Sequence, residues 1–104
     1  MALTRSFKET VVRRVAADPA FGEALLAEGV NALLSGEVDV GKALLRDYIN
    51  ATIGFAALAE AVGTPPKSLM RMFSPSGNPA ARNLFAVIEH LQRSSGVRLA
   101  VHAA

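Results

Sequence analysis

Residues that could bind or transform a ligand fall in two stretches of this 104-residue chain, and the first is a false match. The segment Gly36 to Ala43 (GEVDVGKA) has the spacing of a phosphate-binding loop up to its last position. That position needs a hydroxyl group to hold magnesium, and Ala43 has none. Glu37 and Asp39 would also place two carboxylates inside the phosphate cradle. We therefore expect this segment to be a turn between helices.

Catalytic and metal-binding residues have little support elsewhere in the sequence. The chain has no cysteine, which excludes disulfides, thiolate metal sites and thiol nucleophiles. The two histidines, His90 and His102, have no ligand or acid neighbour at motif spacing. Glu89 directly precedes His90 and therefore lies on a different face of a helix. We expect no enzymatic activity, no cofactor and no bound metal.

The second stretch, Phe55 to Arg71 (FAALAEAVGTPPKSLMR), has the pattern of two short helices joined by a tight turn. Gly63 can close the first helix in the left-handed conformation. Pro65 and Pro66 lack a backbone N–H and must stand at or before the first turn of the second helix. The small Ala59 lets the two helices approach closely, as in a helix-turn-helix. The apolar wedge between them would consist of Leu58, Val62 and Leu69.

The second of these helices would direct Lys67, Ser68 and Arg71 outward. In a helix-turn-helix this helix reads base edges in the major groove of DNA. Arg71 could bond the O6 and N7 acceptors of a guanine, or it could pair with Glu60 or a phosphate. An ordinary helical hairpin has the same spacing and is the alternative interpretation.

Further phosphate contacts are predicted just after this unit. Asn78, Arg82 and Asn83 fall in a loop and at a helix start, where amides and side chains often hold phosphates. Capping and turn formation are the alternative for Asn78, which precedes Pro79. Residues 64–104 have five basic residues and one acidic residue (+4), whereas residues 1–63 have six and eight (−2). This basic half favours a polyanionic partner, although a solvated helix face has the same composition.

The elements that position these residues are predicted to be helices. Ser6 and Glu9 have capping-box spacing, which predicts a helix to about Ala17. Asp18-Pro19 then begins a second helix, which ends at Ser35-Gly36. The other predicted helices run from Asp39 or Val40 to about Thr52, from Phe55 to Val62, from Lys67 to Phe73, and from Ala80 to Gln92.

The C-terminal run from Val97 to Val101 alternates apolar and other residues, as a half-buried strand does. Met70, Met72 and Phe73 are expected in the core. The predicted fold is therefore one all-α domain, with an N-terminal helical extension (1–38), a helix-turn-helix DNA-binding core (39–104) and a short C-terminal strand.

A set of residues between Val40 and Val101 carries a resemblance to a known family. These residues are Leu58-Ala59, Gly63, Leu69, Arg71, Ser74, Gly77-Asn78-Pro79, Leu84 and Gly96-Val97-Arg98-Leu99. The span resembles the Cro/lambda-repressor type of helix-turn-helix domain and, more closely, the antidote proteins of bacterial addiction (toxin–antitoxin) modules. Its most specific part is LMRMFSPSGNP, since such antidotes place Gly-Asn-Pro just after the recognition helix. The chain departs from related repressors at Phe55 and Pro66, where those repressors often have a glutamine that bonds DNA. The operator sequences of those repressors therefore do not predict the operator of this chain.

The resemblance implies an antitoxin that binds double-stranded operator DNA as a homodimer, represses its own operon and neutralises a toxin from the adjacent gene. The toxin would be a small endoribonuclease-like protein. A stand-alone repressor without a toxin, and a helical protein-interaction module that does not bind DNA, are the alternatives.

The N-terminal helices, Phe7 to Leu34, are the predicted toxin-binding surface because a repressor-type core already accounts for the residues from Val40 onward. Phe21, Leu25 and Leu26 are the predicted contacts, and a purely structural extension is the alternative. No run approaches the ~20 apolar residues that span a bilayer, and Met1 to Lys8 has no signal-peptide pattern. We expect a cytoplasmic protein with no membrane partner.

Overall fold

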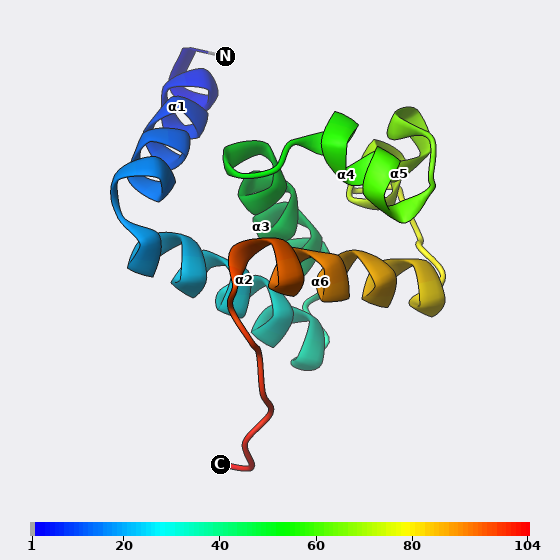
Figure 1. The fold of residues 1–104 in the computed structure, drawn as a ribbon. Helices are drawn as coiled ribbons and strands as arrows, with labels where there is room; N and C mark the ends of the chain where they lie inside the picture. The colour runs from blue at the N-terminus through cyan, green and yellow to red at the C-terminus, as the bar shows by residue number, and fades with distance from the viewer. Residues whose placement is uncertain (1) are drawn as a thin grey trace.

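The computed structural model describes the backbone of residues 2–104 and the side chains of residues 9–104. These residues form six helices and no strand (Figure 1). The helices are α1 (Ala2–Ala17), α2 (Pro19–Leu34), α3 (Val38–Ala51), α4 (Phe55–Val62), α5 (Pro66–Met72) and α6 (Ala81–Ser95). None of the described helices is long and apolar enough to cross a membrane.

Local capping explains several of these boundaries. The carboxylate of Asp18 accepts a hydrogen bond of 3.1 Å from the Ala20 N–H, and Pro19 is the first residue of α2. Both features were predicted from the sequence and are confirmed. The prediction for the first helix was wrong: α1 already begins at Ala2, so Ser6 lies inside the helix and is not its N-cap.

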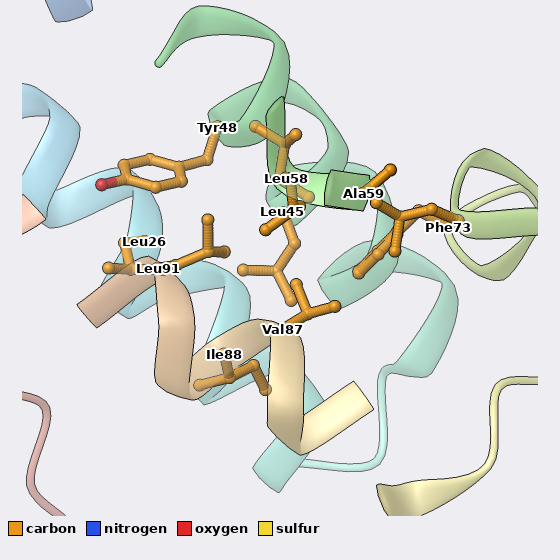
Figure 2. Packing of buried hydrophobic residues seen from close by; sticks show 11 residues of the cluster. Leu26, Leu45, Tyr48, Leu58, Ala59, Phe73, Val87, Ile88 and Leu91 are labelled. Atoms are coloured by element: carbon orange, nitrogen blue, oxygen red, sulfur yellow. The ribbon is translucent and has the colours of Figure 1, made fainter. Parts of the chain in front are cut away.

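One hydrophobic cluster joins α2 and α3 to the α4–α5 pair and to α6 (Figure 2). In Figure 2 its side chains come from different helices and point toward one another. Burial of this apolar surface is the main term that holds the short helices in place. The buried members are Leu26, Leu45, Tyr48, Ile49, Leu58, Ala59, Leu69, Phe73, Val87, Ile88 and Leu91.

The predicted C-terminal strand from Val97 to Val101 is absent. Gly96 ends α6 with φ at +75°, and the chain beyond it extends away from the helices only toward its C-terminus (Figure 1). Val97 and Leu99 pack against the core, and the Leu99 N–H donates to the side-chain oxygen of Gln92 at 2.9 Å. The apolar alternation therefore reflects an extended segment docked on a helix, because the described residues offer no second strand to pair with.

One core assignment also differs from the prediction. Met70 is 46% exposed, since Leu69 and Phe73 occupy the inward face of the short α5 helix and Met70 lies one residue around from it. Met72 is half-buried and Phe73 is buried, as expected. Leu34 is 60% exposed at the end of α2, where Leu33 instead packs toward Gly41 of α3.

Candidate nucleic-acid interface

The turn between α4 and α5 depends on Gly63. Its φ and ψ of 71° and 32° lie in the left-handed region, which costs glycine little. The N–H groups of Gly63 and Thr64 both donate to the Ala59 carbonyl, the latter at 3.0 Å. The carbonyl of Pro65 then accepts from the Leu69 N–H at 3.0 Å, which begins α5. The helix pair is thus closed by backbone hydrogen bonds at both sides of the turn.

The angle between α4 and α5 is held by buried apolar side chains. Leu58 and Leu69 are fully buried, and Ala59 is 3% exposed. The rings of Phe55 and Phe73 are 6.2 Å apart with their planes tilted by 57°, a favourable aromatic arrangement. Phe55 therefore supports the second helix from the core side.

The outward face of α5 carries the three residues predicted to read DNA. Lys67, Ser68 and Arg71 are all exposed, and Met70 is exposed beside them. Within the described residues neither Arg71 nor Lys67 forms an ion pair, so the pairing of Arg71 with Glu60 that the sequence left open is not made. Both cationic groups are accordingly available to an anionic or base-edge partner.

The loop that follows α5 folds back tightly onto the end of that helix. The Ser74 hydroxyl donates to the Arg71 carbonyl at 2.7 Å, and the Gly77 N–H donates to the Ser74 carbonyl at 3.0 Å. A β-carbon on Gly77 would overlap the backbone oxygen of Arg71, so only glycine fits there. Close packing on α5 therefore requires the glycine of the Gly-Asn-Pro motif. The same close approach places Asn78 beside the C-terminal end of α5.

The remaining predicted phosphate contacts lie at the start of α6. Asn78, Arg82 and Asn83 are exposed, and Figure 1 shows the first turn of α6 on the same side of the molecule as α4 and α5. Ala80 is the N-cap residue of α6, and no side chain among the described residues caps that end. Asn78 thus does not serve as the helix cap that the sequence offered as its alternative role. The first amides of α6 are left without a side-chain acceptor.

Lys42 supports this loop from inside, and sequence reasoning missed it. Its side chain is 3% exposed, and its ammonium donates to the carbonyls of Ser74 (3.0 Å), Pro75 (3.4 Å) and Gly77 (2.7 Å). Lys42 is the lysine of the false phosphate-loop match. Only Gly36 and Glu37 of that segment lie in the expected turn between α2 and α3, and residues 38–43 belong to α3. The available signal was its helical spacing with Leu45 and Ile49, which put it on the buried face of α3.

The predicted toxin contacts occupy different environments. Leu26 is fully buried in the core, so naming it as a surface contact was wrong; its helical spacing could not distinguish the core face from a partner face. Leu25 is half-buried and packs against the same cluster. Phe21 is half-buried, with the Arg14 guanidinium 4.4 Å above its ring centre. Only Phe21 and Leu25 remain partly accessible.

Comparison with known proteins identifies no relative that would indicate the function of this site. No protein-family model matches this chain, and no significant match is found among curated proteins or solved structures. The α4–α5 unit, the loop after it and the start of α6 are therefore the basis on which a function can be inferred.

Proposed function

We propose that this chain is a DNA-binding transcriptional regulator in which α4 and α5 form a helix-turn-helix. The observation that carries the proposal is the outward face of α5, where the cationic groups of Lys67 and Arg71 have no ion-pair partner among the described residues. The inward face of the same helix is anchored by Leu69 and Phe73. A rigidly held helix with free donors on its outer face is what major-groove readout requires.

The side chains on this face suit particular base edges. Arg71 offers a guanidinium fork that matches the O6 and N7 acceptors of guanine. Met70, which was expected in the core and is instead exposed, offers an apolar surface for a thymine methyl group. Ser68 can donate to or accept from a base edge or a phosphate.

Phosphate contacts would come from the elements that flank α5. Asn78, Arg82 and Asn83 are exposed near the uncapped start of α6, where main-chain amides and the helix dipole favour an anion. Such contacts fix the register of a protein on the duplex without reading sequence. They would orient α5 relative to the groove.

A homodimer is the expected DNA-binding form. The seven residues of α5 span roughly 10 Å at 1.5 Å per residue, which is enough to read only a few base pairs. Two copies would double the base readout and the phosphate contacts. They would bind a pseudo-palindromic operator with half-sites about 10 base pairs apart or a multiple of that.

We further propose that the protein acts as the antitoxin of a toxin–antitoxin module, with α1 and α2 as the toxin-binding part. This rests on the Gly-Asn-Pro resemblance and on the partly accessible Phe21 and Leu25. A stand-alone repressor would share the DNA-binding unit and differ only in lacking a partner from the adjacent gene.

Selection from a random pool of DNA duplexes tests the DNA-binding proposal and needs no assumption about the operator sequence. We expect enrichment of a two-fold symmetric motif. Its affinity should fall linearly with the logarithm of salt concentration, since phosphate contacts release counterions. Failure to enrich any motif, together with no affinity for bulk duplex DNA at low salt, would contradict the proposal.

A further inference from the structure

The buried ammonium group of Lys42 is the least expected feature of the core. A charged group loses its hydration when it is buried, and this is costly unless other polar groups replace the water. Among the described residues it pairs with one carboxylate, that of Asp39 at 3.5 Å, and Asp39 is 83% exposed. Three main-chain carbonyls of the loop after α5 replace most of the lost hydration.

The loop in turn depends on Lys42 for its shape. Pro75 and Pro79 have no N–H group, so two donors that could bond carbonyls of the loop locally are missing. Among the described residues, Lys42 alone bonds the carbonyls of Pro75 and Gly77, and it shares the Ser74 carbonyl with the Gly77 N–H. The shortest of these bonds, 2.7 Å, is to Gly77, the residue that contacts the end of α5.

The direction of these carbonyls sets the direction of the loop's amides. All described peptide bonds are trans, so the N–H of a peptide group points opposite to its carbonyl. The Gly77 carbonyl points at Lys42, and the Asn78 N–H of the same peptide group therefore points away from it. That N–H makes no hydrogen bond within the described residues.

We propose that Lys42 is a positioning residue for the DNA-binding surface. This inference rests on the proposed function. Lys42 binds no DNA itself, because the loop covers it; it draws three carbonyls inward and so holds Asn78 and the start of α6 at a fixed place relative to α5. Arg82 and Asn83 can contact phosphates at the same time as Lys67 and Arg71 lie in the groove only if this spacing is kept.

The absence of cysteine permits a test that changes the charge and little else. In the Lys42→Cys variant the single thiol can be alkylated in the unfolded chain with 2-bromoethylamine, which restores an ammonium at the length of lysine. Alkylation with 1-iodopropane gives a side chain of the same length with a methyl group in its place. The unsubstituted chain, treated with each reagent and refolded, is the control for modification elsewhere.

We expect both alkylated forms to regain the helical circular dichroism of the unsubstituted chain. The ammonium form should bind the selected duplex within about threefold of the unsubstituted chain, whereas the propyl form should bind at least tenfold more weakly. A folded propyl form that binds DNA as tightly as the ammonium form would overturn the proposal. If the propyl form fails to fold, the Lys42→Gln variant takes its place. If neither form folds, Lys42 is required for the fold as a whole and not for the position of the loop, and the proposal is wrong.

A double-mutant cycle separates positioning from a general loss of charge. Arg82→Ala should weaken binding in the unsubstituted chain but much less in the propyl form, because the loop no longer holds the start of α6 in place. Lys67→Ala, on the independently anchored α5, should weaken binding equally in both. Equal effects of Arg82→Ala in the two forms would contradict positioning, whereas absence of DNA binding by the unsubstituted chain would instead refute the proposed function.

Discussion

Arg71 is the side chain on which the proposed base readout depends most. It is exposed, forms no ion pair within the described residues, and lies on a helix whose opposite face is buried. Arg71→Ala should weaken binding to the selected duplex by about 1–3 kcal/mol and relax the preference at one base position. Affinities for a panel of single-base variants of the duplex measure both effects. A uniform loss across the panel would show that Arg71 contacts a phosphate instead.

Gly77 supplies a prediction about stability. Because a β-carbon there would overlap the Arg71 carbonyl, Gly77→Ala should force the loop to move and destabilise the protein by about 1–3 kcal/mol. Urea unfolding followed by circular dichroism measures this, with Ser76→Ala, an exposed position of the same loop, as the control. If both variants unfold at the same urea concentration, the tight approach of the loop to α5 is wrong.

Single residues show where the sequence is informative and where it is not. Leu58, Leu69 and Phe73 could be assigned to the interior because their spacing fits one face of a short helix. Met70 could not, since a two-turn helix has too few apolar positions to define the edge of its buried face. Lys42 was missed because its buried carbonyl partners lie more than thirty residues further along the chain, where no local pattern indicates them.

The C-terminal tail illustrates the same limit for a whole element. Period-two alternation describes any extended segment with one covered side, and only a neighbouring strand makes it a sheet. By contrast, the α2 start at Asp18-Pro19 and the α4 bounds were predictable, because a proline, a capping carboxylate and a left-handed glycine act within a few residues.

Truncation checks the docked tail. Removal of residues 101–104 should change the free energy of unfolding by no more than about 0.5 kcal/mol, because these residues are exposed. Removal of residues 97–104 should cost roughly 2 kcal/mol, since Val97 and Leu99 would no longer be half-buried against the core. Thermal or urea unfolding of the two truncated chains gives the comparison. Equal stability would mean that the tail does not pack on the helices in solution.

Across the whole molecule, α1 is far from the proposed DNA-binding face: it packs on α2 and α3, and Figure 1 shows it on the opposite side from α5. A chain that begins at Asp18 keeps the cap of α2 and loses α1. Operator binding should survive this deletion, whereas binding to the product of the adjacent gene should be abolished. Co-purification with that product and anisotropy with the duplex measure the two activities. Unchanged partner binding would place the toxin contact elsewhere.

We propose that α5 binds DNA through its outward face, and a pair of charge-matched variants distinguishes this face from the rest of the surface. The double variant Lys67→Ala/Arg71→Ala removes two cationic groups from α5, and Arg13→Ala/Arg14→Ala removes two from α1. Fluorescence anisotropy with the selected duplex, at several salt concentrations, should show near-complete loss of specific binding for the first variant and only a small change for the second. Equal affinities for the two folded variants would contradict the claim.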